Sequence, residues 1–116
     1  IMGHKVGLLT LYAGLAGGAD IILVPEIPYT IDAVCKKIAE RHASGSRFSI
    51  IAIAEGAISK EDSCLSKKEL KKKIAEERKK HPSVAYKLAK DIEERIGAEV
   101  RVTVPGHTQR RAACTV

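Results

Sequence analysis

Side chains that bind hydroxyl groups and anions gather in three short segments of the sequence. These segments are Met2-Gly3-His4, Glu55-Gly56 and residues 106–110 (Gly-His-Thr-Gln-Arg). A carboxylate accepts hydrogen bonds from hydroxyl groups, whereas a His and the planar fork of an Arg suit a phosphate. Arg101 precedes the third segment and adds a second guanidinium. Together these residue types favour a phosphorylated polyol as the ligand.

Taken one at a time, the same residues have plainer interpretations. A lone Glu at the end of a strand is more often a solvated or capping carboxylate, and a lone exposed His or Arg is more often a surface residue. Composition and periodicity alone therefore lead only to an α/β domain that is a candidate for phosphate binding.

Three short runs predict the strands that position these residues. Residues 20–24 place four apolar residues after Asp20 and stop at Pro25, and residues 48–54 run directly into Glu55. Residues 99–104 alternate polar and apolar side chains before Pro105, as a strand with one exposed side does. Open α/β sheets bind ligands beyond the carboxyl ends of their strands, which is where Glu55 would stand.

Four helices are expected between and around these strands, and residues 57–66 are expected to be a polar connection. Residues 6–16 are apolar on nearly all sides, which predicts a buried helix. The next helix follows the cap Thr30 and ends at Gly45, and a capping box of Ser66 and Glu69 opens a basic helix that Pro82 breaks. Residues 84–96 carry apolar residues every four positions and stop at Gly97.

The order of these elements predicts an α/β fold, a three-layer sandwich with a short, mainly parallel sheet flanked by helices. With 116 residues, the chain is expected to form a single domain over residues 1–116, with a helical insertion at residues 57–97. Aromatic residues make up only 3%, so the core is expected to be aliphatic.

The net charge of +6 comes almost entirely from residues 67–80, which hold eight Lys or Arg and three Glu. Such a helix could bind nucleic acid through phosphate contacts. Interleaved aromatic residues for base stacking are missing, however, and Glu69–Lys73 and Glu76–Lys80 are spaced for i, i+4 pairs on a solvated helix. A nucleic-acid partner is therefore the less favoured interpretation.

The three cysteines are scattered and suggest neither a disulfide framework nor a zinc site, so we expect no metal site and a cytoplasmic location. No apolar run approaches the roughly 20 residues that cross a bilayer, and no membrane association is expected.

Four sequence motifs resemble those of the 6-phosphofructokinases, in the same order and spacing. Residues 17–26 (GGADIILVPE) look like the family's GGAD-strand-PE segment, and residues 48–56 resemble its strand ending in a sugar-contacting Glu. Residues 101–110 (RVTVPGHTQR) resemble the R-x-T-x-L-G-H-x-Q-R-G-G signature, and Met2-Gly3 with Gly7 match M-G-R-x-x-G. The fold that the resemblance implies is the smaller, fructose-6-phosphate-binding domain.

The resemblance implies a role for each matching residue. Glu55 would bind hydroxyls of fructose 6-phosphate or fructose 1,6-bisphosphate, and the Met2-Gly3 loop would contact the sugar. Phosphate would be held by His107 and Arg110, with Gln109 between them. Arg101 would reach into a neighbouring subunit's site, which implies a homo-oligomer.

The sequence also departs from the family pattern near the ligand. His4 replaces the family's Arg, which helps to neutralise the transferring phosphoryl group, so no catalytic residue is assigned. Pro105 replaces a Leu, and Arg111-Ala112 replace two glycines. The 116 residues contain neither the glycine-rich nucleotide loop nor the T-I-D-N-D segment with the catalytic Asp.

Two hypotheses follow. The first is the fructose-6-phosphate-binding portion of a glycolytic 6-phosphofructokinase, a fragment, degenerate product or split piece that is not expected to transfer phosphate alone. No cofactor is expected within the chain, and Mg²⁺ with ATP or pyrophosphate is implied for the full-length family. The alternative is a non-catalytic assembly or nucleic-acid-binding module that uses residues 67–80.

Overall fold

The computed structural model describes residues 1–111, except for the side chains of residues 107, 110 and 111. Ala112 and Cys114, which the sequence analysis singled out, therefore lie outside the described residues. The elements follow in the order α1 (Leu8–Ala16), β1 (Ile21–Leu23), α2 (Ile31–Ala43), β2 (Ile51–Ile53), α3 (Lys60–Ser63), α4 (Lys67–Lys80), α5 (Val84–Ile96) and α6 (Gly106–Arg111).

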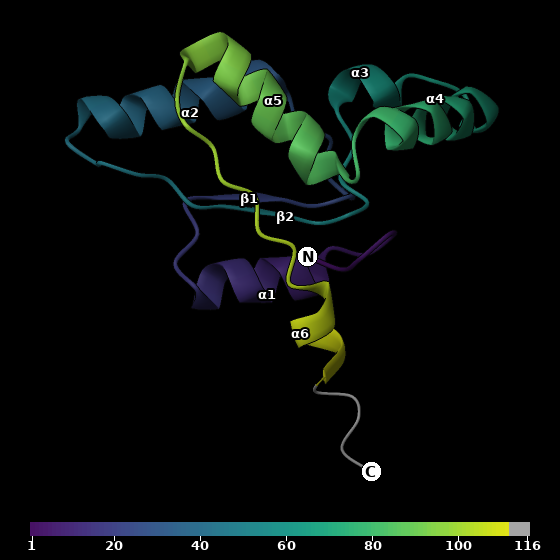
Figure 1. Ribbon diagram of the computed structural model, residues 1–116, viewed down its shortest axis with the longest axis horizontal. Coiled ribbons are helices and arrows are strands. Elements are labelled where there is room, and N and C mark those ends of the chain that lie inside the picture. Colours follow the sequence, from purple (N-terminus) through teal and green to yellow (C-terminus); the bar gives the residue numbers. More distant parts are fainter. Residues whose placement is uncertain (112–116) are drawn as a thin grey trace.

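The two strands form a parallel sheet that lies between two layers of helices. Ile21 is paired with Ile51, and Leu23 is paired with Ile53. Helix α1 covers one face of the sheet, and α2 and α5 lie together over the other (Figure 1). The predicted three-layer α/β architecture with a short parallel sheet is confirmed, and both strands are shorter than the runs that predicted them.

The core lies between the sheet and the layer of α2 and α5. Its buried residues are aliphatic, as the composition predicted: Leu23, Val34, Ala57, Leu88 and Ile92. Full burial of a Leu, Val or Ile side chain stabilises a domain by about 1.5–3 kcal/mol. Helix α5, within the predicted insertion 57–97, is therefore part of the core.

The expected capping residues set the helix ends. The Thr30 hydroxyl accepts a hydrogen bond from the Ala33 amide at 3.3 Å, which opens α2. Ser66 and Glu69 form the predicted capping box of α4. Helix α5 ends at Gly97, whose φ of 70° is the left-handed conformation that glycine adopts without strain.

The helix predicted at residues 6–16 forms, but the prediction that it is buried is wrong. Only Thr10 and Gly14 of α1 are buried. Tyr12 and Leu15 are each about two-thirds exposed, at 64% and 65%. A sheet of two strands covers a single side of a helix, so an apolar residue on any other side of α1 meets solvent.

The predicted strand at residues 99–104 is not formed. This segment leaves the α5 layer and passes the level of the sheet to reach α6 (Figure 1). Its Val100 amide bonds to the Glu93 side chain at 3.2 Å instead of to a strand. Alternation indicates a half-buried surface, but a strand also needs a neighbouring strand for its backbone hydrogen bonds. The described residues provide no such neighbour for residues 99–104.

Two short helices form where the sequence analysis predicted no helix. Residues 106–111 form α6, in which the Gln109 amide donates to the Pro105 carbonyl at 2.9 Å. Pro105 itself needs no backbone donor at this position, so it opens a helix rather than only ending a strand. Helix α3 forms within the polar connection because the Ser59 hydroxyl accepts the Asp62 amide at 3.2 Å. None of the helices in residues 1–111 has the length and apolar character that a bilayer crossing requires.

Candidate functional site

The first residues of the chain are held against the carboxyl end of β2. The Ile1 nitrogen donates to the Ile53 carbonyl at 2.9 Å, and the Glu55 amide donates to the Ile1 carbonyl at 2.8 Å. Ile1 is thus hydrogen-bonded to the residues on either side of Ala54, which is the pattern of two parallel strands. The Gly56 amide then donates to the Gly3 carbonyl at 3.0 Å. These bonds bring Met2-Gly3-His4 and Glu55-Gly56 together.

Two glycines make this close approach feasible. Gly3 has a φ of 143°, which is strained for any residue with a side chain. At Gly56 a β-carbon would lie 2.0 Å from the His4 carbonyl oxygen, far inside van der Waals contact. The two loops can therefore meet only because neither carries a side chain at these positions.

Glu55 forms an ion pair with His4 at the junction of these loops. The Nδ1 atom of His4 contacts Oε1 of Glu55, and the two side chains are 62% and 41% exposed. An exposed carboxylate that is held by one partner retains further lone pairs for hydroxyl donors. Glu55 therefore keeps acceptor positions that are open to solvent, and its binding of a polyol stays a prediction.

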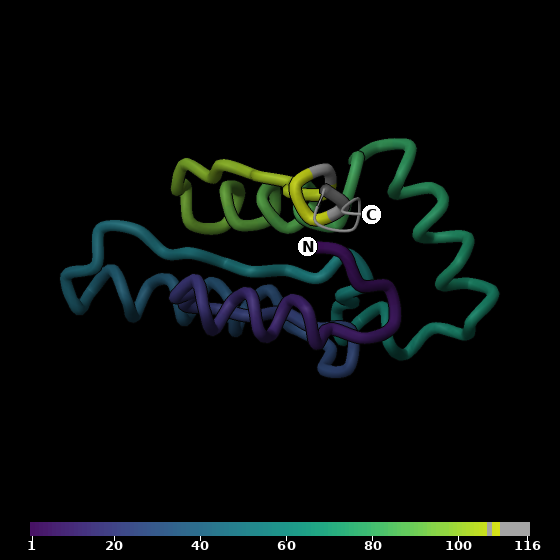
Figure 2. Tube along the Cα trace, turned by 90° about the horizontal axis from the view of Figure 1, so that it is seen from below, coloured from purple at the N-terminus to yellow at the C-terminus, as the bar shows by residue number. Residues whose placement is uncertain are grey.

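Helix α6 joins the site through Gln109. The Met2 amide donates to Oε1 of Gln109 at 3.2 Å, across 107 positions of sequence. Figure 2 shows the N-terminal residues beside this helix. Met2, Glu55 and Gln109 line one cavity of about 540 Å³, together with apolar residues of α1 and β2. Three of the predicted site residues thus converge from distant parts of the chain.

Three of the basic residues predicted for the site, His107, Arg110 and Arg101, are not seen to line the cavity of Glu55. His107 and Arg110 stand on α6 with Gln109, but their side chains lie outside the described part of the structure. Arg101 is 87% exposed, pairs with Glu99 and does not line the cavity of Glu55. Within this chain Arg101 is therefore not part of the site.

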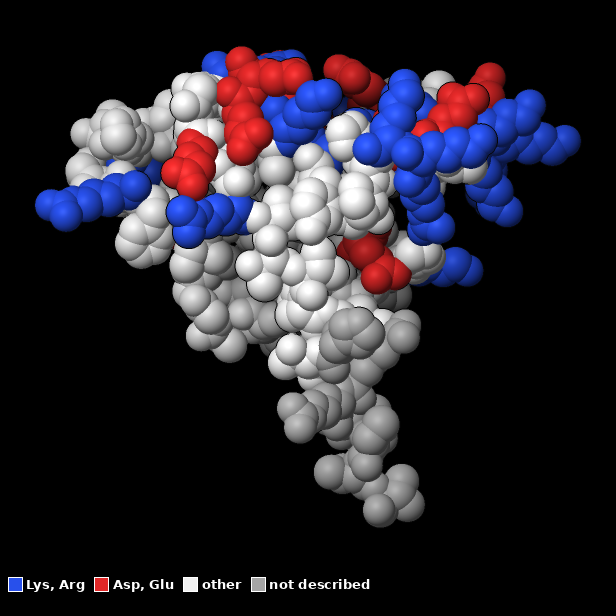
Figure 3. Space-filling model, viewed as in Figure 1, with Lys and Arg blue, Asp and Glu red and all other residues white. Residues whose placement is uncertain are grey.

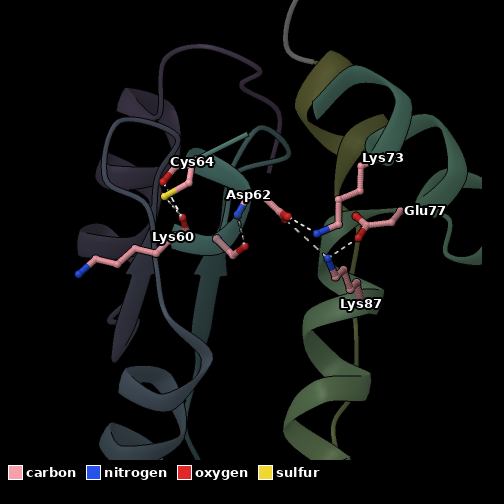
Figure 4. A network of polar contacts seen from close by, with 8 residues as sticks. Lys60, Asp62, Cys64, Lys73, Glu77 and Lys87 are labelled. Atoms are coloured by element: carbon pink, nitrogen blue, oxygen red, sulfur yellow. Dashed lines mark hydrogen bonds and ion pairs between the residues drawn. The ribbon is translucent and has the colours of Figure 1, made fainter. Parts of the chain in front are cut away.

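A second cavity of about 810 Å³ also has Glu55 in its wall and was not foreseen from the sequence. His4 lines it, and so do residues from α3, α4 and α5. Asp62, which is 10% exposed, contacts the Lys73 ammonium and lies 3.8 Å from the Lys87 ammonium, which in turn binds Glu77 at 2.5 Å (Figure 4). This network ties the three helices together.

Burial opposes the charge on Asp62, but hydrogen bonds from Lys73 and Ser59 and the charge of Lys87 hold its pKa below the usual range. The hydrogen bond to Asp62 in turn raises the pKa of Lys73. Tyr29 also lines the second cavity, and burial, with smaller effects from nearby carboxylates, raises its pKa to about 12. The tyrosine therefore stays neutral and the Asp62–Lys73 pair stays charged near pH 7. Only the capping pattern of Ser59 and Asp62 was a sequence signal for this network.

Among the side chains that the structure describes, no three of His, Cys, Asp or Glu are grouped so as to hold a metal ion. The site offers hydrogen-bond acceptors, a histidine and backbone amides, which suit the recognition of hydroxyl groups.

The family model "Phosphofructokinase" matches residues 1–116. The chain belongs to the phosphofructokinase family. The predicted resemblance is thereby confirmed. Family membership does not favour the alternative of a nucleic-acid-binding module.

Individual phosphofructokinases agree with this assignment. The ATP-dependent 6-phosphofructokinase of Spirochaeta thermophila is 48% identical over 110 residues, which cover 95% of this chain and 30% of the relative. The ATP-dependent 6-phosphofructokinase of Chloroflexus aggregans is 44% identical over 110 residues, which cover 95% of this chain and 28% of the relative. The chain thus spans less than a third of the length of these relatives.

Two solved structures share the fold. Phosphofructokinase from Pichia pastoris in the T-state superposes with a TM-score of 0.68 at 30% identity, over 95% of this chain and 10% of that chain. Phosphofructokinase from Saccharomyces cerevisiae gives 0.63 at 28% identity, over 95% of this chain and 13% of that chain. The fold assignment to the phosphofructokinases is therefore supported by both sequence and structure.

Proposed function

We propose that this chain is the sugar-phosphate-binding portion of a 6-phosphofructokinase and takes fructose 6-phosphate or fructose 1,6-bisphosphate. The observation that carries this proposal is the convergence of Met2, Glu55 and Gln109 on one cavity at the carboxyl end of β2. Ligands of α/β sheets bind at this edge. The relatives named ATP-dependent 6-phosphofructokinase support the choice of ligand.

Each residue has a stated part in this binding. The Glu55 carboxylate accepts hydrogen bonds from sugar hydroxyls, and the loop of Met2 and Gly3 lines the cavity wall. His107 and Arg110 on α6 hold the phosphate. Arg101, with its exposed guanidinium, contacts the sugar phosphate of a neighbouring copy, so the functional form is a homo-oligomer.

Phosphoryl transfer is assigned to a larger assembly than these 116 residues. We propose that Mg²⁺ with ATP or pyrophosphate is bound by other parts of the family's fold, in the cytoplasm, where glycolysis takes place. His4 occupies the position of the family's phosphoryl-neutralising Arg, and its contact with Glu55 supports a part for His4 in the proposed sugar site. We derive no catalytic step for the isolated chain.

The test is a two-dimensional NMR titration of the purified chain with fructose 6-phosphate, with fructose as the unphosphorylated control. Shifts of the Met2, Glu55 and Gln109 amides with the phosphate ester and not with fructose are expected. Glu55→Gln removes the negative charge of the carboxylate that accepts hydrogen bonds from the sugar hydroxyls. We expect this change to weaken binding about tenfold, equivalent to about 1.4 kcal/mol. Glu94→Gln is the matched control, because Glu94 is 65% exposed on α5 and lines neither cavity.

If the phosphate ester leaves these amides unshifted in a folded spectrum, the isolated chain does not bind the sugar phosphate and the proposal is wrong for it. Equal loss of affinity in Glu55→Gln and Glu94→Gln would contradict the assignment of the cavity.

A further inference from the structure

A third cavity, of about 650 Å³, lies on the side of the sheet that α2 and α5 cover. Its walls come from α2, β2, α5 and residues 98–103. Met2, Glu55 and Gln109 do not line it, so a ligand in this cavity would not meet the residues of the proposed sugar site. The volume falls within the roughly 300–1,000 Å³ that is usual for small-molecule sites.

The inner part of this cavity is apolar. It is lined by aliphatic side chains of β2, of the two helices and of the segment after α5: Ile38, Ile51, Ile53, Leu88, Ile92 and Val100. These residues belong to the core or pack against it. Water beside such side chains finds few hydrogen-bond partners, so its replacement by an apolar chain is favourable.

The cavity opens at the end where α2 and α5 terminate, on the left of Figure 1. Phe48 and Ile96 line it there and are 72% and 38% exposed, so solvent reaches the cavity beside them. His42 and Arg47 are also lining residues and lie at the same end, in the last turn of α2 and in the loop that follows it. Figure 3 shows basic side chains at this edge of the molecule, apart from the larger group over α3 and α4.

The charges at the mouth of the cavity leave Arg47 without a carboxylate partner. Glu99 is the one carboxylate among the described lining residues, and its Oε1 atom lies 3.0 Å from Nη2 of Arg101. Arg41, near the end of α2, is held by Asp20 at 2.9 Å. Arg47 forms no ion pair within the part of the chain that the structure describes, so its guanidinium is available to an anion.

The loop that carries Arg47 is fixed on both sides of this residue. Before it, Gly45 has a φ of 95° and the Ser46 amide donates to the Arg41 carbonyl at 3.0 Å. After it, the Ile50 amide donates to Oδ2 of Asp20 at 2.7 Å. A charged group on a held loop loses less conformational entropy when a ligand binds.

We propose that this cavity binds an amphipathic monocarboxylate, with the apolar chain in the inner part and the carboxylate at Arg47. A guanidinium binds a carboxylate through two parallel hydrogen bonds. One guanidinium balances the single charge of a carboxylate, whereas a phosphate monoester carries nearly two negative charges at pH 7. The Ser46 hydroxyl and the His42 ring line the same cavity and can donate further hydrogen bonds. This inference does not depend on the proposed sugar site.

The test is a two-dimensional NMR titration of the full chain with hexanoate, octanoate and decanoate below their micelle concentrations. Acetate is the control for the head group alone, and decan-1-ol is the control for the chain alone. We expect decanoate to shift the amides of residues 47–53 and 98–103, and acetate to leave them unshifted. Because each buried CH₂ group tightens binding about fourfold, the dissociation constant should fall about fifteenfold for every two CH₂ groups.

Two variants separate the head group from the chain. Arg47→Gln should weaken decanoate binding about tenfold and leave decan-1-ol unaffected, which a structural role of Arg47 would not do. Lys37→Gln is its matched control, because Lys37 is exposed on α2 and does not line the cavity. Ala39→Phe should fill the cavity from an exposed position of α2 and weaken both ligands, whereas Ala33→Phe, on the same helix but outside the cavity wall, should not.

Several results would overturn the inference. Equal affinities for decanoate and decan-1-ol, unchanged in Arg47→Gln, would exclude the contact with the head group. Shifts confined to residues 8–16 would show that the exposed apolar side of α1 takes the chain instead. An absence of shifts at the cavity residues also refutes the site, and if light scattering then detects dimers, a second copy of the chain is the occupant.

Discussion

The α-carbon of Gly56 faces the main chain of His4 so closely that a methyl group on it would lie 2.0 Å from the His4 carbonyl oxygen. This relationship sets the position of the loop that contains Met2 relative to Glu55. A side chain at position 56 would separate the two loops and break the hydrogen bond from the Gly56 amide to the Gly3 carbonyl.

Gly56→Ala is therefore expected to lower the free energy of unfolding by about 1–3 kcal/mol, the range that is typical of overpacking at a tight contact. Urea denaturation measures this change. Gly106→Ala is the matched control, since a β-carbon there meets no atom within 4 Å. An equal stability for Gly56→Ala and Gly106→Ala would show that the two loops do not meet as described.

The ion pair between His4 and Glu55 is expected to affect binding more than stability. Both side chains are largely accessible to solvent, and exposed ion pairs contribute about 0.2–1 kcal/mol. A double-mutant cycle with His4→Ala and Glu55→Gln should therefore give a coupling energy below about 1 kcal/mol in urea denaturation. A coupling of several kcal/mol would mean that the pair is a structural core element and not a ligand site.

The chain is expected to lose stability on acidification because of Asp62. Its folded-state pKa is lowered, so its stabilising contribution is present above the unfolded pKa of about 3.9 and is lost as the pH falls through the lower folded value. Urea midpoints measured from pH 6 down to pH 2 should show this loss.

Asp62→Asn should flatten that acid dependence and lower stability near pH 7 by about 2 kcal/mol, because Lys73 and Lys87 lose a nearly buried partner. Glu61→Gln serves as the control, since Glu61 precedes Asp62 but forms no described ion pair. The same acid dependence in Asp62→Asn and in the unaltered chain would exclude Asp62 as its source.

Helix α4 is expected to depend on its capping box. Its residues include none that is buried, so the cap is a large part of what fixes its first turn. Ser66→Ala should cost about 1 kcal/mol, and Ser66→Thr, which keeps an acceptor oxygen, should restore most of it. Amide hydrogen exchange over residues 67–70 measures the fraying. Equal protection in the two variants would contradict a role for the cap.

Local sequence signals predicted most of the helices well. The helix ends are fixed by hydrogen bonds and backbone conformations that involve only a few neighbouring residues, at Thr30, Ser66 and Gly97. Such ends can be predicted without knowledge of the tertiary structure. The sequence alone placed only Glu55 at a strand end, and it was the resemblance to the phosphofructokinases that implied a shared sugar contact for Met2 and Glu55.

Features that depend on distant partners were predicted poorly. The alternation of residues 99–104 does not show whether a neighbouring strand exists, and the apolar character of residues 6–16 does not show how much of α1 is covered. The network of Asp62, Lys73, Glu77 and Lys87 joins three helices, and the only local sequence signal for it was the capping pattern at Ser59.

Helix α1 exposes apolar side chains to solvent, among them Tyr12 and Leu15. Such side chains lose contact with water when two molecules associate, and this burial stabilises the associated form. Crowding of the isolated chain should therefore favour aggregation. Dilute samples, checked by light scattering, are the condition under which each measurement above reports on a single molecule.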